Sequence, residues 1–300
     1  MHKRVQASSA RKTAILANAA CVLFWGFSFI SIKIAVRVFP PMTLGALRFA
    51  IAIIILGAVK RIRNPRETLA PRDIPLLALS GISGVTLYFF CENNGVALVS
   101  ASEASIIIGA IPVLTMFVEW IAEKRRRNAG APAFKARSWL GVLLSLAGVA
   151  LVAGVSITLS GNAAGYLFMG GAALSWVAYG FLTKPLFIRH SRSFIVFWQN
   201  LFGFLGFIPF ALTEFSRWGN PAPGVVLHVL FLAICCSALG YLFYAHALNV
   251  LGVSISSVFV NLIPVVAVAA AFVILGERLA PLQWGGAALV LAGVYLTVMP

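Results

Sequence analysis

Charged residues are scarce in this sequence of 300 residues. Only 10% are Asp, Glu, Lys or Arg, whereas a soluble domain carries about 25%. Hydrophobic residues make up 61%, and a chain this apolar cannot cover itself with polar surface. Composition therefore excludes an ordinary soluble domain and indicates a protein surrounded largely by lipid.

Residues that often carry catalysis are also few. Asp73 is the only aspartate, which excludes an aspartyl pair or an Asp-rich metal site within one chain. The four cysteines lie in apolar runs without CxxC spacing, and the four histidines lack metal-ligand spacing. A GxxxxGK[ST] phosphate loop is missing as well. We expect no metal and no cofactor, although a serine nucleophile paired with His228 or His246 stays open.

What the sequence has instead is long apolar runs. A helix needs about 20 apolar residues to cross a bilayer, and short polar connections divide the chain into ten such runs. This pattern predicts an all-α membrane protein with ten transmembrane helices. The predicted spans are 13–36, 42–60, 73–94, 101–122, 138–156, 163–187, 193–213, 224–248, 253–275 and 282–299.

Basic residues give the chain a net charge of +15, and their placement identifies the cytoplasmic side. The N-terminus and the second, fourth and sixth loops hold most Lys and Arg, whereas the odd-numbered loops hold only Arg37, Arg217 and Arg278. Such alternation follows the positive-inside rule and has no reason to exist in a nucleic-acid site. We expect both termini in the cytoplasm, a bacterial inner membrane, contact with lipid and no nucleic acid.

An internal repeat relates the two halves of the chain. Trp25 matches Trp176 at an offset of 151, and Pro112 matches Pro264 at 152. After a cytoplasmic segment 1–12, the predicted repeats are 13–156 and 157–300, with five spans each. Because five is odd, the second repeat must be inverted, which is the architecture of many secondary transporters with a site near the midplane.

The same residues resemble a known family, the EamA-type transporters of the drug/metabolite transporter superfamily. The resemblance rests on Trp25-Gly26, the stretch "ALVSASEASIIIGAIPV", its partner "ISSVFVNLIPV", "LGER" at 275–278 and "LAGV" in each half. Within the family the chain is most similar to YddG-type amino-acid exporters. The resemblance implies export of amino acids, other metabolites or toxic compounds through ten spans.

Polar and aromatic side chains within the spans are the candidates for a substrate path. Trp25 and Ser28 share a helical face, as do Trp176 and Tyr179, and aromatic side chains with polar tips suit an amphipathic solute. The proposed substrate-binding residues are Trp25, Ser28, Tyr88, Ser105, Trp176, Tyr179, Tyr241, Ser257 and Asn261. For Ser257 and Asn261, hydrogen bonding between packed helices is an equally good explanation.

Backbone breaks and charges add two further hypotheses. Pro112 and Pro264 each leave a carbonyl unbonded and are expected to kink their helices. Glu92 is the candidate for proton coupling, because ionisable residues within spans are functional candidates by default. Arg48 also falls within a span, and a structural ion pair between it and Glu92 is the alternative explanation.

Three functions follow as hypotheses. The first is a secondary exporter of amino acids or related metabolites that works by alternating access, acting as a monomer or weak homo-oligomer on a small-molecule substrate. The second is a membrane-embedded enzyme. The third is a channel, which is disfavoured because no ring of charge is evident. Export of cationic toxic compounds is the alternative substrate class.

Overall fold

The computed structural model describes residues 2–96, 98, 107–125, 136–152, 163–275 and 280–299, and within these ranges it contains helices and no strand. Seven helices are long and apolar enough to span a membrane. They are Ser9–Ile32, Pro41–Arg63, Pro71–Gly95, Ala163–Ile188, Arg192–Glu214, Pro223–Leu251 and Pro281–Val298. Three shorter apolar helices are Ile107–Ala122, Ala136–Val152 and Val253–Val266. The chain is an integral, all-helical membrane protein, and the count of ten spans stays a prediction.

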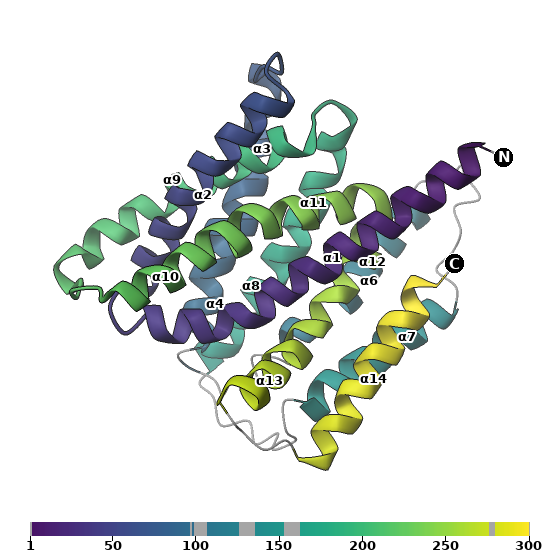
Figure 1. The fold of residues 1–300 in the computed structure, drawn as a ribbon. Coiled ribbons are helices and arrows are strands. Elements are labelled where there is room, and N and C mark those ends of the chain that lie inside the picture. The colour runs from purple at the N-terminus through teal and green to yellow at the C-terminus, as the bar shows by residue number, and fades with distance from the viewer. Residues whose placement is uncertain are drawn as a thin grey trace.

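Figure 1 shows how the helices are arranged in a bundle. In chain order they are α1 (His2–Ala35), α2 (Pro41–Arg63), α3 (Ile74–Gly81), α4 (Tyr88–Val96), α6 (Ile111–Arg125), α7 (Ala136–Val152), α8 (Ala163–Thr183), α9 (Arg192–Glu214), α10 (Pro223–Phe231), α11 (Gly240–Leu251), α12 (Val253–Val258), α13 (Leu262–Leu275) and α14 (Pro281–Val298). Proline opens α2, α10 and α14, at a position where its missing N–H costs no hydrogen bond.

Two of the spans and one of the shorter apolar helices are interrupted rather than regular. A π-helical segment, Ile82–Leu87, joins α3 to α4, and a second one, Leu232–Leu239, joins α10 to α11. A 3₁₀ segment, Phe259–Asn261, joins α12 to α13. Each segment changes the rotation per residue, so the side chains after it face a different direction from those of a continuous α-helix.

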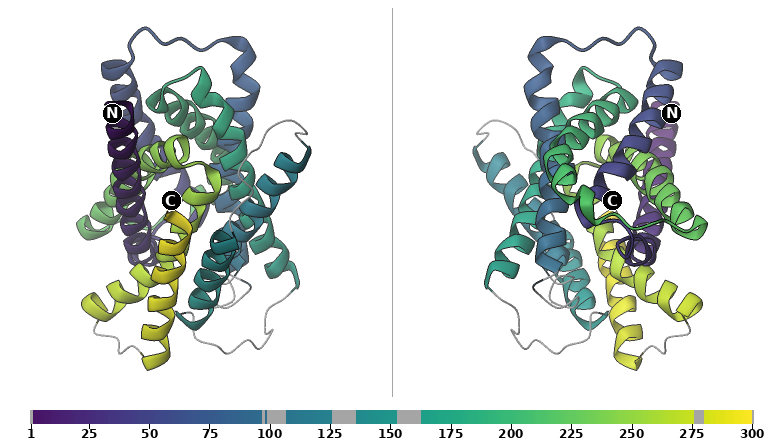
Figure 2. Two further views of the ribbon diagram at one scale, coloured as in Figure 1. Left: turned by 90° about the vertical axis from the view of Figure 1, so that its right-hand side faces the viewer. Right: turned by 90° about the vertical axis from the view of Figure 1, so that its left-hand side faces the viewer.

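Helices of the first half pack against helices of the second. The main partnerships are α2 with α9, α1 with α11, α4 with α8, and α7 with α14. Figure 2 shows α7 and α14 running together at the lower part of the molecule. A Cβ at Gly148 would lie 2.6 Å from the carbonyl oxygen of Gly286, so only glycine permits this approach. Close packing is therefore what these glycines do.

Two ends of the helix bundle can be distinguished. At the latch end, defined as the end where α2 finishes and α9 begins, α1 also starts and α14 finishes. Arg11 on α1 donates a hydrogen bond to the Val298 carbonyl, and Arg137 on α7 donates to that of Met299 at 2.6 Å. The cavity end is the opposite one, where α1 finishes and α2 begins.

Candidate functional site

Six aromatic side chains meet between the two halves of the bundle. This aromatic cluster consists of Trp25, Tyr88, Trp176, Tyr179, Tyr241 and Tyr244, which come from α1, α4, α8 and α11. The ring centroids lie 5.4 Å apart for Trp25 and Trp176, and 5.0 Å apart for Tyr88 and Trp176. The cluster therefore contains five of the proposed substrate-binding residues, joined by Tyr244.

The π-helical segments position this cluster. Tyr241 donates its hydroxyl hydrogen to the Gly84 carbonyl at 2.9 Å, and Trp25 donates its indole N–H to the Cys236 carbonyl at 3.1 Å. Each π-helical segment thus supplies a carbonyl to an aromatic side chain of the opposite half. Gly84 also has to be glycine, because a Cβ there would lie 2.3 Å from the Tyr179 ring.

A buried polar network borders the cluster toward the latch end. Gln199 on α9 donates to the hydroxyls of Ser80 and Thr183, each at 2.8 Å, and its carbonyl oxygen accepts a longer bond of 3.4 Å from Tyr179. Gln199 is fully buried. Sequence reasoning missed this residue, although an amide within a span is itself a signal of a buried polar contact.

Arg48 lies on the other side of the cluster, toward the cavity end. It is 5% exposed, and its Nε donates to the Ser237 hydroxyl at 2.8 Å. The guanidinium carbon lies 5.4 Å and 5.0 Å from the ring centres of Phe49 and Phe89, respectively. These contacts leave the two terminal nitrogens of Arg48 without a hydrogen-bond partner among the described residues.

Glu92 is close to Arg48 but does not contact it. Its carboxylate accepts a hydrogen bond of 2.9 Å from the Tyr88 hydroxyl, one helical turn away on α4. The Glu92 and Arg48 charges attract each other, yet no ion pair of 4.0 Å or less joins these two described side chains. The suggested structural ion pair is therefore absent in this conformation.

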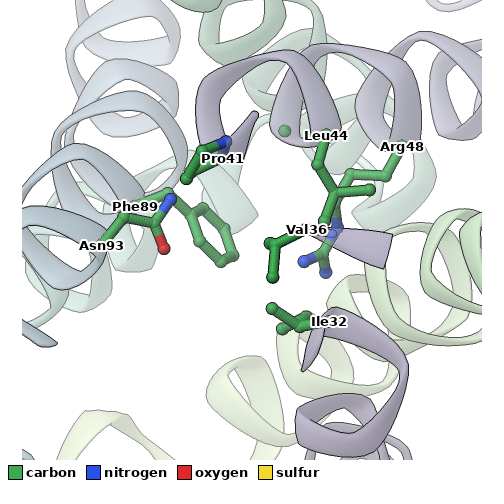
Figure 3. Close-up of a pocket in the computed structure, with 8 residues that line it drawn as sticks. Ile32, Val36, Pro41, Leu44, Arg48, Phe89 and Asn93 are labelled. Atoms are coloured by element: carbon green, nitrogen blue, oxygen red, sulfur yellow. The ribbon is translucent and has the colours of Figure 1, made fainter. Parts of the chain in front are cut away.

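A small cavity reaches Arg48 from the cavity end (Figure 3). It is lined by Ile32, Val36, Pro41, Leu44, Gly45, Arg48, Phe89 and Asn93, with a volume of about 20 Å³. Such a volume holds roughly one water molecule. A larger cavity of about 300 Å³ lies between α2 and α9, but its lining has no charged residue. Of these two cavities, the one at Arg48 offers a charged group to a ligand.

The remaining predicted residues lie outside the aromatic cluster or outside the described residues. Ser28 donates to the Trp25 carbonyl at 2.7 Å, and Ser257 donates to the Ser254 carbonyl at 2.8 Å. Asn261 donates to the Ser145 hydroxyl of α7 at 2.8 Å, which is a bond between packed helices. Ser105 lies outside the described residues.

The two kink residues stand near interruptions of their helices. Pro112 is the second residue of α6, and α6 begins directly after a turn at Ala110. Pro264 is the third residue of α13, and α13 begins directly after the 3₁₀ segment. In both halves the irregular backbone precedes the proline, where the missing N–H does not interrupt an established helix.

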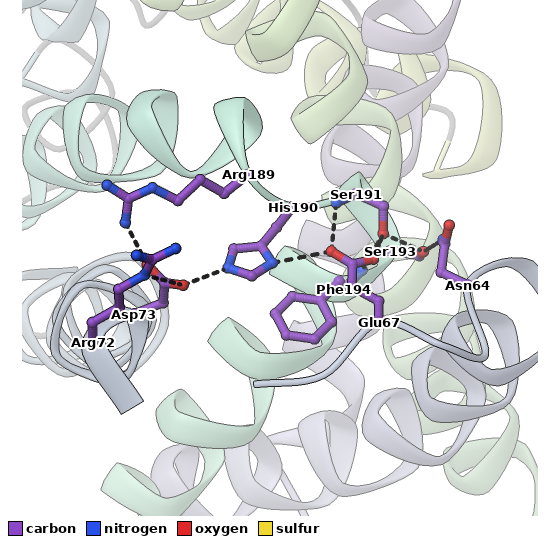
Figure 4. Close-up of polar contacts among 9 residues, drawn as sticks. All are labelled: Asn64, Glu67, Arg72, Asp73, Arg189, His190, Ser191, Ser193 and Phe194. Carbon is purple, nitrogen blue, oxygen red and sulfur yellow. Dashed lines mark hydrogen bonds and ion pairs between the residues drawn. The ribbon is translucent and has the colours of Figure 1, made fainter. Parts of the chain in front are cut away.

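A group of charged side chains ties two loops together at the latch end (Figure 4). His190 places Nδ1 3.1 Å from a Glu67 carboxylate oxygen and Nε2 2.9 Å from an Asp73 oxygen. Glu67 also accepts bonds from the Ser191 N–H at 2.8 Å and its hydroxyl at 2.5 Å, and Arg189 pairs with Asp73 at 2.7 Å. We call Glu67, Asp73, Arg189, His190 and Ser191 the ionic latch.

Comparisons with known proteins agree with the transporter architecture. The EamA-like transporter family matches residues 12–154 and again 163–299. A probable terminal-alkyne amino-acid exporter of Streptantibioticus cattleyicolor is 28% identical over 94% of this chain and 92% of its own length. A probable amino-acid metabolite efflux pump of Salmonella typhimurium is 27% identical over 96% of this chain and 95% of its own length.

The fold itself recurs in a solved crystal structure. That structure superimposes with a TM-score of 0.78 over 96% of this chain and 97% of the other, at 19% identity. An uncharacterized transporter of Archaeoglobus fulgidus is 28% identical over 93% of this chain. Because the family covers both halves of the sequence, the chain belongs to the EamA-like transporter family.

Proposed function

We propose that this protein exports amino acids or related small metabolites across the bacterial inner membrane. Two inverted five-helix repeats, 13–156 and 157–300, move around the aromatic cluster in alternating access, with both termini in the cytoplasm. The observation that carries the proposal is the cluster itself, because its side chains come from both halves and would separate or close as the halves move. The names of the curated relatives support the substrate class.

The chemistry of the cluster suits an amphipathic solute. Tryptophan and tyrosine offer an apolar face together with a polar tip, which gives moderate attraction and allows release. The same faces attract cations, so export of cationic toxic compounds is the second candidate. In this proposal the chain is not an enzyme and needs no cofactor.

A counterflow assay in proteoliposomes tests the proposal. We expect saturable uptake of a labelled amino acid against an internal load of the same amino acid. Changing Trp176 to Ala should lower kcat/KM by about tenfold or more, since an aromatic contact within the path is lost. Trp284→Ala is the matched control, because Trp284 lies on α14 and is 58% exposed.

Three other outcomes would contradict the proposal. Saturable movement of cationic dyes without any amino acid would favour the second candidate. Chemical conversion of the solute without vectorial movement would indicate an enzyme. Equal loss in the Trp176 and Trp284 variants would show that the aromatic cluster is not the path.

Proton coupling through Glu92 is part of the same proposal. Glu92 is half-buried within a span and accepts a hydrogen bond from Tyr88, so a proton gained or lost there would change a contact of the aromatic cluster. In Glu92→Gln we expect transport that no longer responds to a pH gradient. An unchanged pH dependence in a transport-competent Glu92→Gln protein would contradict the coupling.

A further inference from the structure

Arg48 is a buried cation whose charge is only partly compensated. Its Nε is bonded to a neutral hydroxyl, that of Ser237, and its guanidinium carbon lies near two phenylalanine rings. A guanidinium stays charged in proteins and has five N–H donors. Burial of such a group within a membrane protein is costly unless an anion or several acceptors surround it. An anion bound beside the guanidinium would therefore be stabilised by it.

The free donors of Arg48 point into the cavity. In Figure 3 the terminal nitrogens lie beside Val36 and Ile32, on the side of the cavity that faces Phe89. Two N–H groups directed from one planar fork match the two oxygens of a carboxylate, which is a geometry that lysine cannot reproduce. The cavity supplies one more polar side chain, that of Asn93.

The Glu92 carboxylate supplies a charge of opposite sign near Arg48. Glu92 follows Phe89 by three residues on α4, and its carboxylate accepts a hydrogen bond from Tyr88 rather than from Arg48. A solute with a carboxylate and an ammonium could meet Arg48 with the first and Glu92 with the second. The aromatic faces of Tyr88 and Trp176, whose centroids lie 5.0 Å apart, adjoin this position.

We propose that Arg48 binds the carboxylate of the transported amino acid at the inner end of the cavity, with Glu92 facing its ammonium group. This assignment rests on the proposed function and names its recognition site. A cavity of about 20 Å³ holds roughly one water molecule, so binding requires the ends of α1, α2 and α4 around it to separate. Separation of these helix termini would open the bundle at its cavity end.

The test compares three solutes that differ in charge. Phenylalanine, phenylalaninamide and phenethylamine compete with counterflow of the labelled amino acid in proteoliposomes. In the unmodified protein we expect phenylalanine to compete about tenfold to hundredfold better than its amide, as is typical for charge-assisted hydrogen bonds. In Arg48→Gln this preference should disappear, while competition by the amine stays within about twofold.

Two further variants separate recognition from folding. Arg48→Lys keeps the charge and loses the fork, so it should keep a reduced preference for the carboxylate. Arg37→Gln removes an exposed arginine at the same end of the bundle and should leave the preference unchanged. If Arg48→Gln does not fold, competition by phenylalanine is compared with competition by its amide in the unmodified protein and in Arg48→Lys. A smaller difference in Arg48→Lys supports the assignment of Arg48, and an equal difference contradicts it.

The outcomes distinguish this inference from the proposed function. Amino-acid counterflow with no preference for the carboxylate, or a preference that Arg48→Gln retains, overturns the assignment of Arg48 and leaves the exporter intact. Absence of any amino-acid counterflow in the unmodified protein overturns the proposed function, and the assignment with it.

Discussion

The two ends of the helix bundle are held by different kinds of contact. At the latch end, His190 joins Glu67 to Asp73, and Glu119 pairs with Lys184. Every ion pair among the described residues belongs to this end. At the cavity end the contacts are aromatic packing, such as Phe39 against Trp218 with centroids 6.0 Å apart, and hydrogen bonds.

This difference indicates which end opens more easily in this conformation. Charged contacts are directional and join loops that belong to different halves, so the latch end is fixed in one arrangement. Apolar side chains at the cavity end can separate and repack without breaking an ion pair. Alternating access would require the reverse state, in which the latch end is released and the cavity end is packed.

Loss of the ionic latch should have the largest effect. His190 lies between two carboxyl groups, with Nδ1 3.1 Å from a Glu67 oxygen and Nε2 2.9 Å from an Asp73 oxygen. In His190→Ala the buried carboxylate of Asp73 and the partly exposed carboxylate of Glu67 lose their shared partner. We expect the Tm in detergent to fall by roughly 5 °C or more. The measurement is thermal unfolding followed by fluorescence-detected size exclusion.

A second histidine provides the matched control. His228 lies at the cavity end, and its Nδ1 is 3.1 Å from the hydroxyl of Ser31. His228→Ala removes a single hydrogen bond, so its Tm should change by about 2 °C or less. Equal losses in the two variants would show that the ends do not differ as described.

Chemical accessibility sharpens the comparison in a second way. In a chain whose four native cysteines are replaced by alanine, Asn93→Cys reports on the cavity end and Ser80→Cys on the buried network near the latch end. If most molecules have the cavity end open and the latch end closed, a membrane-impermeant thiol reagent should modify the Asn93→Cys protein about tenfold faster than the Ser80→Cys protein.

Combining the accessibility measurement with the latch variant tests the coupling of the two ends. Adding His190→Ala should speed modification at position 80 and slow it at position 93, because the released latch favours the opposite state. Faster modification at both positions would indicate loosening of the fold rather than a change of state.

Much of the fold followed from the sequence because hydrophobic length and charge placement are properties of the chain itself. The apolar runs predicted helices that the structure contains, including α6 with Pro112 and α13 with Pro264. Trp25 and Trp176 were singled out because rare residues recurred at matching places in the two halves. The structure brings the two rings together at 5.4 Å.

Other features depend on tertiary contacts and could not be predicted. The prediction that Ser257 and Asn261 both line the substrate path assumes a continuous α-helix, whereas Phe259–Asn261 is a 3₁₀ segment with about three residues per turn. Asn261 therefore bonds Ser145 on α7 instead of facing the aromatic cluster. The ionic latch could not be predicted either. Counting Lys and Arg in the loops indicates the side of the membrane on which each loop lies, but not which side chains form ion pairs.

A smaller effect is expected at the second charged contact of the latch end. Glu119 on α6 accepts bonds from Lys184 at 3.1 Å and from the Ser254 hydroxyl at 2.5 Å. The Lys184 side chain is 50% exposed, so water screens the pair. In Glu119→Gln, which can still accept from Ser254, we expect a Tm fall of about 2–4 °C. A loss as large as in His190→Ala would contradict the leading role of the ionic latch.

The smallest effect should come from the polar contact that the cavity end does have. Glu214, the last residue of α9, accepts hydrogen bonds from the Thr43 N–H at 2.8 Å and from its hydroxyl at 3.0 Å, which places a carboxylate at the start of α2. Such an acceptor at a helix N-terminus contributes about 0.5–1 kcal/mol. Glu214→Gln keeps one acceptor and loses the charge, so Tm should fall by about 2 °C or less. Thr213→Ala, which removes an exposed hydroxyl bonded only to the Phe210 carbonyl one turn earlier, is the control. If Glu214→Gln instead destabilised the protein as strongly as His190→Ala, then both ends would be fixed by charge, and the cavity end would not be the one that opens.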